Sequence, residues 1–189
     1  LELCEKYYAR MVVDESFWEF AFDQEAETML PYIGQFQSLF LLRSFTKMYG
    51  IPGLRLGYGL CSDTDLLERM EEVRQPWGVS IPAQEAGIAA LDETDWCRQV
   101  RSYVTEQRMW LAGELESMGC KVYPSSANYL LFYLDQELME SLKRKGILIR
   151  DCSNYQGLTK GYYRIAVKTE EENRQLIDAI RYALDKEDL

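Results

Sequence analysis

The chain has 189 residues, of which 47% are apolar, a length and composition that suit one domain or two small ones with a packed core. Its net charge of −10 argues against nucleic acid and anionic membrane surfaces as partners. The chain has no histidine, which removes Ser-His-Asp and Cys-His catalysis and histidine-ligated zinc from consideration, and we expect no metal site.

The first 60 residues predict a short helix and three strands. Residues 1–9 are typical of the tail of a helix without an N-terminal cap, and the chain starts with leucine, which we interpret as a cut inside a domain. Helical or turn segments connect three β-like runs, which are Met11–Val13, Leu39–Leu42 and Arg55–Leu60. Such spacing is typical of a sheet packed between helices, an α/β arrangement in which active residues follow the strand ends.

Helices dominate the middle of the chain. Asp63 is a candidate N-cap for a helix through Arg69 to Val73, after which Pro76, Gly78 and Pro82 break the pattern. The sequence then predicts helix from Ala83 to about Met118. This helical segment is predicted to break at Asp92–Asp95 and to end at Gly119.

The last 70 residues alternate between strands and helices. We expect a helix over Gln136–Lys145 and a last helix opened by the capping box of Thr169 and Glu172. The expected strands are Val122–Tyr123, Tyr129–Leu134, Ile147–Ile149 and Tyr162–Val167. The pattern predicts three parts: residues 1–82 from a larger domain, connecting helices over 83–119, and a small domain over 120–189.

The five scattered cysteines form no CxxC motif, which indicates reduced thiols of a cytoplasmic protein. No apolar run is long enough to span a membrane, and no signal peptide is visible. We therefore expect neither a disulfide framework nor a membrane as partner.

Lys47 lies in the most informative stretch, Ser-Phe-Thr-Lys-Met-Tyr-Gly-Ile-Pro-Gly-Leu-Arg-Leu-Gly-Tyr. It follows an apolar strand, and Arg55 follows inside a Gly-Leu-Arg-Leu-Gly frame. A lysine that forms a Schiff base needs nearby charges that keep its amine neutral. An anionic cofactor needs a fixed cation and hydroxyl donors, which Arg55, Ser44 and Thr46 can supply. The alternative is a surface lysine beside a turn, with Arg55 in an ordinary salt bridge.

This stretch resembles the pyridoxal-phosphate (PLP) lysine segment of fold-type-I aminotransferases and decarboxylases. It is most similar to the branch that holds histidinol-phosphate aminotransferase and threonine-phosphate decarboxylase. The similarity continues from Val12–Phe17 to Tyr163–Val167. It implies an α/β fold, the C-terminal part of the PLP-dependent transferase fold, with residues 1–82 from the PLP-binding large domain. It also implies that roughly the first half of such an enzyme is absent.

The resemblance implies roles for individual residues. Lys47 would bond to PLP, Ser44 and Arg55 would hold the cofactor phosphate, and Asp14 would pair with the pyridinium nitrogen. From local sequence alone, Asp14 is also a candidate helix cap or turn former. Phe17 stands where the family often has tyrosine and cannot donate a hydrogen bond, which fits the decarboxylase branch better.

Two arginines near the end of the chain would bind the substrate. The resemblance implies that Arg164 grips the α-carboxylate and that Arg150 helps to bind a substrate phosphate. The alternatives are a salt bridge at the edge of the core for Arg164 and one to Asp151, or another acid, for Arg150.

The resulting hypothesis is PLP-dependent decarboxylation of L-threonine O-3-phosphate, a small amino-acid phosphate, by a homodimer. Histidinol-phosphate aminotransferase is the alternative within the same class of enzymes. A non-catalytic fragment that serves as a folding or interaction module is a second alternative. We expect residues 1–189 alone to lack turnover, because the resemblance places part of the cofactor site in the absent half.

Overall fold

The computed structural model describes residues 1–21 and 28–187. The chain divides into two compact units, residues 1–100 and 101–189. The division falls inside helix α6 (Thr94–Ser117). The predicted boundaries after residues 82 and 119 remain a proposal.

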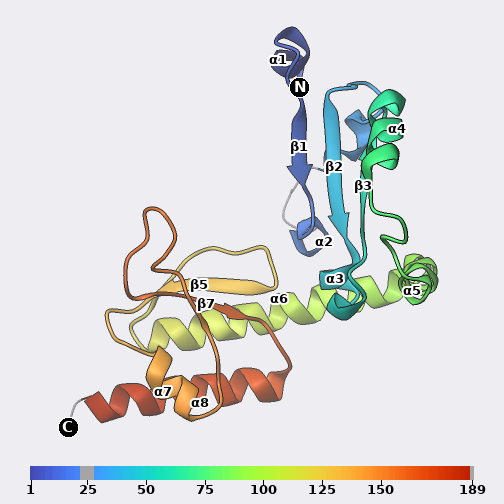
Figure 1. Ribbon diagram of the computed structural model, residues 1–189. Helices are drawn as coiled ribbons and strands as arrows, with labels where there is room; N and C mark the ends of the chain where they lie inside the picture. Colours follow the sequence, from blue (N-terminus) through green and yellow to red (C-terminus); the bar gives the residue numbers. More distant parts are fainter. Residues whose placement is uncertain (22–27, 188–189) are drawn as a thin grey trace. The chain divides into compact units, whose positions relative to one another are not determined.

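The three apolar runs of the first unit form one sheet in the order β1 (Met11–Asp14), β2 (Leu39–Ser44), β3 (Gly57–Cys61) (Figure 1). Strands β1 and β2 are parallel, and β2 and β3 are antiparallel. Strand β2 is central, and its Leu39 and Leu41 are fully buried. The three predicted strands are thus present, but the third begins at Gly57 and not at Arg55, which follows a short 3-10 helix. The central strand is the most buried, because an apolar run between two neighbours loses the most surface to solvent.

The glycines of β3 allow close packing against β2. A Cβ atom on Gly59 would lie 2.5 Å from a ring carbon of Phe40, and one on Gly57 would lie 2.9 Å from the carbonyl oxygen of Arg43. Both distances are shorter than van der Waals contact, so a side chain at Gly57 would push the strands apart and one at Gly59 would displace the Phe40 ring. Gly57, the second glycine of the Gly-Leu-Arg-Leu-Gly frame, therefore has a packing role.

The helices of the first unit include one whose N-cap, Asp63, was predicted and one whose start differs from the prediction. They are α1 (Glu2–Lys6), α2 (Trp18–Ala21), α3 (Phe45–Met48), α4 (Thr64–Val73) and α5 (Ile81–Leu91). Asp63 caps α4 by accepting a hydrogen bond from the N–H of Leu66 at 3.0 Å. The predicted break at Pro82 is wrong, because Pro82 lies in the first turn of α5, where no intrahelical N–H is needed.

The second unit contains an antiparallel sheet in the order β4 (Lys121–Val122), β5 (Tyr129–Tyr133), β7 (Tyr162–Ala166), β6 (Arg150–Asp151). Its alternate residues Leu130, Phe132, Tyr163 and Ile165 are buried. The other helices of this unit are α7 (Met139–Arg144) and α8 (Glu170–Glu187), and with α6 they lie on one side of β5 and β7 (Figure 1). The other alternating residues, Tyr129, Leu131 and Tyr133 of β5 and Tyr162, Arg164 and Ala166 of β7, are half-buried or exposed.

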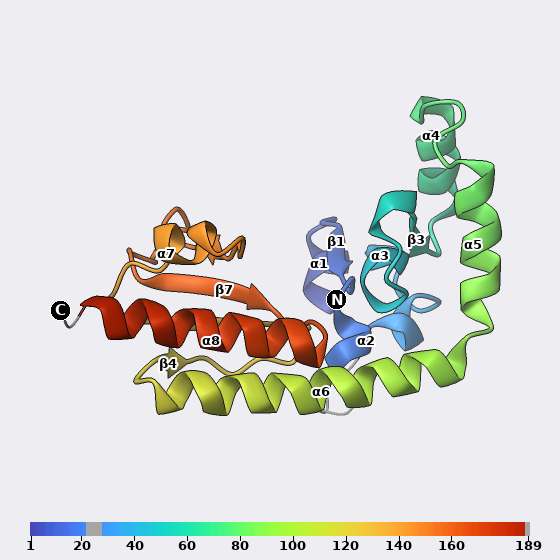
Figure 2. The same ribbon diagram turned by 90° about the horizontal axis from the view of Figure 1, so that it is seen from below.

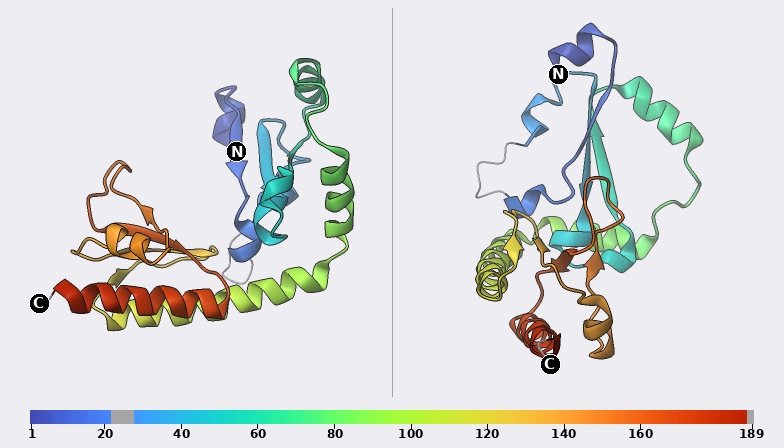
Figure 3. Two further views of the ribbon diagram at one scale, coloured as in Figure 1. Left: turned by 60° about the horizontal axis from the view of Figure 1, so that its bottom comes forward. Right: turned by 90° about the vertical axis from the view of Figure 1, so that its left-hand side faces the viewer.

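Helices α6 and α8 run side by side (Figure 2, Figure 3). The buried Asn173 of α8 donates to Gln107 Oε1 of α6 at 2.9 Å. The predicted capping box of α8 is confirmed, since Thr169 Oγ1 accepts from the N–H of Glu172, and Glu172 Oε2 accepts from the N–H of Thr169, both at 3.3 Å. Hydrogen bonds from Lys168 and then Thr169 lower the pKa of Glu172 to about 2, so the cap stays charged.

The structure corrects the segment around α7. The predicted strand Ile147–Ile149 is wrong, because the N–H of Ile147 closes the helix end by donating to Leu142 O at 3.0 Å. Gly146, with φ of 76°, makes that turn possible. The strand is the next two residues, Arg150–Asp151. Likewise, α7 starts later than predicted, since the Glu137 side chain caps the N–H of Met139 at 2.8 Å.

All five cysteines are free. Within residues 1–21 and 28–187, no helix is both long and apolar enough to cross a membrane. The same residues contain no group of histidine, cysteine or acidic side chains that could hold a metal ion.

Candidate active site

Asp14 and Ser44 lie at the same edge of the first sheet. Asp14 ends β1 and is paired in register with Leu42 of the parallel strand β2. Ser44 ends β2 two residues later. The carboxyl ends of parallel strands form the usual binding edge of an α/β sheet. The pairing therefore places the segments after β1 and β2 next to each other, as the sequence predicts.

Ser44 begins the short helix that carries Lys47. Its side chain is the N-cap of α3 and accepts a hydrogen bond from the N–H of Thr46 at 3.2 Å. The hydroxyls of Ser44 and Thr46 are 2.9 Å apart. Phe45 and Met48 fill the buried side of α3, which leaves Lys47 exposed. The Lys47 amine lies 5.4 Å from the ring centre of Phe17, so the segments after β1 and β2 meet at this lysine.

Arg55 is held in an unusual backbone conformation. Its φ of 54° places it in the left-handed region, which non-glycine residues seldom adopt outside turns and functional sites. The guanidinium donates to the carbonyl of Pro52 at 3.0 Å. No carboxylate among the described residues forms an ion pair with Arg55, so the ordinary salt bridge considered from the sequence is not present there.

Asp14 is exposed, and its charged form is stabilised by its own turn. Its Oδ1 accepts a hydrogen bond from the N–H of Ser16 at 2.9 Å. Hydrogen bonding to Ser16 lowers the pKa of Asp14, so this carboxylate is ionised at neutral pH. The turn-forming role considered from the sequence is therefore present, and the carboxylate remains exposed.

Glu15 is a residue that the sequence interpretation missed. Its side chain is 5% exposed and accepts from Arg43 Nη2 at 2.8 Å and Nε at 3.1 Å. The hydroxyl of Thr28 and the N–H of Met29 donate to the same carboxylate at 2.9 and 2.7 Å. This buried network ties the segment after β1 to β2. An arginine inside the apolar strand β2 was the available sequence signal, because such a residue needs a buried acid.

Replacing Glu15 with glutamine is expected to lower the free energy of unfolding by about 1–3 kcal/mol, because the largely buried Arg43 guanidinium loses its charged partner. Urea denaturation of the protein that contains this chain measures the loss. Glu72→Gln, on the exposed side of α4, is the matched control. Equal unfolding free energies for the two variants would contradict a role for Glu15 in organising this edge.

Arg150 and Arg164 of the second unit are directly opposite each other on the neighbouring strands β6 and β7. Both are exposed, and Arg164 alternates along β7 with the buried Tyr163 and Ile165, so the two arginines lie on the face of the sheet away from the core. The Arg164 guanidinium lies 5.1 Å from the ring centre of Tyr129, and that of Arg150 lies 5.7 Å from the ring of Tyr155. Neither forms an ion pair with a carboxylate in the described part of the chain.

The salt bridges considered for these two arginines from the sequence are thus not found among the described residues. Like charges directly opposite each other destabilise a sheet. Two cations in this register without a carboxylate partner form an arrangement that an anion stabilises. The structure brings these arginines together in one unit and Asp14, Ser44 and Lys47 together in the other.

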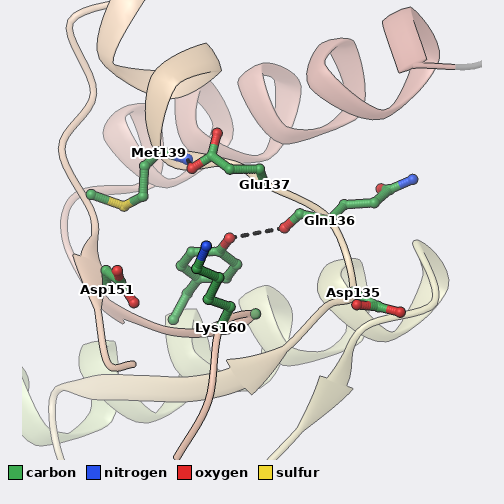
Figure 4. A pocket seen from close by; sticks show the side chains of 8 residues that line it. Asp135, Gln136, Glu137, Met139, Asp151 and Lys160 are labelled. Atoms are coloured by element: carbon green, nitrogen blue, oxygen red, sulfur yellow. Dashed lines mark hydrogen bonds between the residues drawn. The ribbon is translucent and has the colours of Figure 1, made fainter. Parts of the chain in front are cut away.

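A surface cavity of about 470 Å³ in the second unit is lined by none of the predicted site residues (Figure 4). Its lining residues are Asp135, Gln136, Glu137, Met139, Asp151, Lys160, Gly161 and Tyr163. The Tyr163 hydroxyl donates to the carbonyl of Gln136 at 2.8 Å. Glu137 and Asp151 accept hydrogen bonds from backbone N–H groups of their own turns. These acids therefore have local structural roles.

A family model described as aminotransferase class I and II matches residues 1–180. Histidinol-phosphate aminotransferase 2 of Archaeoglobus fulgidus is 39% identical over 173 residues, which are 90% of this chain and 49% of that protein. Threonine-phosphate decarboxylase of Salmonella typhimurium is 35% identical over 185 residues, 96% of this chain and 50% of that protein.

Among solved structures, the histidinol-phosphate aminotransferase of Clostridium acetobutylicum has a TM-score of 0.90 at 27% identity. The match covers 98% of this chain and 57% of the crystallised one. The chain thus spans about half the length of the curated relatives that it matches.

Proposed function

We propose, because this chain belongs to the class I and II aminotransferase family, that the protein containing it decarboxylates L-threonine O-3-phosphate. The product would be an aminopropanol phosphate for the synthesis of a cobalamin-type cofactor. Members of the family are PLP-dependent enzymes. We further propose that the protein acts as a homodimer in the cytoplasm.

The residues of the first unit fit this cofactor by the chemistry of their polar groups. Arg55 offers a guanidinium without a carboxylate partner among the described residues. In the Ser44–Thr46 hydroxyl pair one O–H donates to the other, which leaves one hydroxyl hydrogen for a phosphate oxygen. Asp14 is ionised, as a partner of a protonated ring nitrogen must be. Lys47 presents an exposed primary amine. We propose that Asp14, Ser44, Lys47 and Arg55 hold PLP.

When bound, PLP supplies an electron sink for the bond that breaks at the substrate Cα. The chain's own residues decide which bond that is. Arg164 holds the substrate carboxylate by two parallel hydrogen bonds, and this orientation selects the Cα bond to be aligned. Lys47 then delivers a proton to Cα after carbon dioxide has left. Arg150 holds the phosphate at the other end of the substrate.

The cross-strand pair of Arg150 and Arg164 is the observation that carries this proposal. Two guanidinium groups without carboxylate partners among the described residues are suited to the two anionic ends of one amino-acid phosphate. Phe17 supports decarboxylation over transamination, because the ring near the Lys47 amine has no hydroxyl to donate to the cofactor.

Histidinol-phosphate aminotransferase activity is the second candidate. It is favoured by the Archaeoglobus fulgidus relative, which is 39% identical against 35% for the Salmonella typhimurium decarboxylase. Histidinol phosphate has a phosphate but no carboxylate, so in this reaction Arg164 would bind the carboxylate of the oxo-acid acceptor instead. The third candidate, a non-catalytic fragment, is disfavoured by the presence of Lys47, Arg55, Arg150 and Arg164.

Product analysis of the protein that contains this chain tests the proposal. We expect carbon dioxide and an aminopropanol phosphate from threonine phosphate, without consumption of an oxo-acid acceptor. Transfer of the amino group of histidinol phosphate to 2-oxoglutarate, without carbon dioxide release from threonine phosphate, would replace this proposal by the aminotransferase.

A further inference from the structure

The acid next to Arg150 in the sequence does not neutralise it. Arg150 and Asp151 are consecutive residues of β6, and consecutive strand residues point to opposite faces of a sheet. Asp151 lines the cavity of Figure 4, on the other side from Arg150. Its two oxygens accept from the N–H and the hydroxyl of Ser153 at 2.8 and 3.0 Å. The Asp151 carboxylate thus bonds to Ser153 of the following loop and not to Arg150.

A neutral group is the partner of Arg150 instead. Arg150 Nη2 donates to the side-chain amide oxygen of Asn154 at 3.0 Å. The loop is fixed at its start, since Cys152 is 2% exposed and its N–H donates to Tyr162 O at 2.9 Å. The N–H of Tyr155 donates to Cys152 O at 3.1 Å. Asn154 therefore lies in an anchored turn, between the buried Cys152 and Tyr155, whose ring contacts the Arg150 guanidinium.

We propose that Asn154 is a positioning residue for substrate specificity: its neutral oxygen orients the Arg150 guanidinium for a phosphate dianion and leaves its full positive charge to that dianion. This inference rests on the proposed function, in which Arg150 binds the substrate phosphate. An uncharged acceptor occupies one N–H and restricts the rotamers of Arg150, so less freedom is lost on binding. A carboxylate at the same place would orient the arginine equally well, but it would compete with the phosphate for the charge.

The decisive substitution is Asn154→Asp, which keeps the size and the acceptor oxygen and adds only a charge. Gln156→Glu is the matched control, because it adds the same charge two residues away on the exposed part of the loop. Both are made in the cofactor-loaded protein that contains this chain. The readouts are kcat/KM for threonine phosphate relative to threonine, and the Kd of inorganic phosphate by calorimetry. Unfolding temperatures establish that both variants fold.

We expect Asn154→Asp to lower the preference for the phosphorylated substrate at least about tenfold and to weaken phosphate binding by a similar factor, which corresponds to one lost charge-assisted interaction. Asn154→Ala should cost less than Asn154→Asp, because it removes the orientation but adds no competing charge. Gln156→Glu should stay within about twofold of the unmodified protein, since a solvent-exposed charge further away is screened.

Three outcomes would overturn the inference, and they show whether the proposed function fails with it. If the unmodified protein does not distinguish threonine phosphate from threonine, the proposed function fails and the inference fails with it. If Arg150→Ala loses the preference while Asn154→Asp keeps it, the proposed function stands and the role of Asn154 is overturned. If Asn154→Asp and Gln156→Glu lose the preference equally, general charge explains the effect and the inference is also overturned. A defect confined to Asn154→Asp supports it.

Discussion

Turnover by the protein that contains this chain is expected to fall by at least about 10²-fold, and by up to about 10⁴-fold, when Lys47 is replaced by alanine, since a positioned proton donor contributes a factor in this range. The amine of Lys47 is exposed at the edge where Asp14 and Ser44 end their strands. No other lysine follows a strand of the first sheet in this way in the described residues. Steady-state rates with threonine phosphate measure the loss.

Lys6→Ala provides a matched control for this substitution. Lys6 is also an exposed lysine of the first unit, and its amine also lies 5.4 Å from an aromatic ring, that of Tyr7. We expect its removal to leave turnover unchanged. In addition, borohydride reduction of the loaded protein followed by peptide mapping should place a pyridoxyl group on Lys47. A pyridoxyl group on another lysine, or on none, would contradict the assignment of Lys47 as the cofactor lysine.

The sequence predicts those features that depend on neighbouring residues. The apolar runs at Met11 and Leu39, the N-cap Asp63 and the capping box of Thr169 and Glu172 are all local patterns, and each is found in the structure. The α/β fold and the family are also as predicted, because the motif around Lys47 is specific and the similarity extends along the chain. Local chemistry and family pattern agree here, which makes the prediction strong.

The parts that the sequence did not predict depend on contacts between distant residues. Glu15 and Arg43 are 28 positions apart, and only the pairing of β1 with β2 brings them together. Similarly, a strand of only two residues places Arg150 opposite Arg164. The apolar run that starts three residues earlier was the stronger sequence signal for a strand. That run, Ile147–Ile149, forms no strand, because the N–H of Ile147 bonds to the end of α7. In each case tertiary pairing overrides the local pattern.

Arg150 and Arg164 are predicted to bind different parts of the substrate. Arg164→Ala is expected to reduce kcat/KM for every amino-acid substrate, whereas Arg150→Ala is expected to remove the preference for a phosphorylated one. Loss of one charge-assisted pair costs about 2–5 kcal/mol, or on the order of 30- to 4,000-fold in kcat/KM. The two effects differ because only the phosphorylated substrate offers Arg150 an anion.

Arg174→Ala is the control for both substitutions. Arg174 is an exposed arginine of the second unit, 5.3 Å from the ring of Trp110, and its ion pair with Glu170 lies on helix α8. We expect it to leave both kinetic quantities unchanged, since exposed pairs of this kind contribute little. If Arg150→Ala kept the full preference for threonine phosphate over threonine, the phosphate would have to bind elsewhere. If Arg164→Ala damaged only the phosphorylated substrate, Arg164 and not Arg150 would bind the phosphate, since the register of β6 and β7 places the two arginines directly opposite each other.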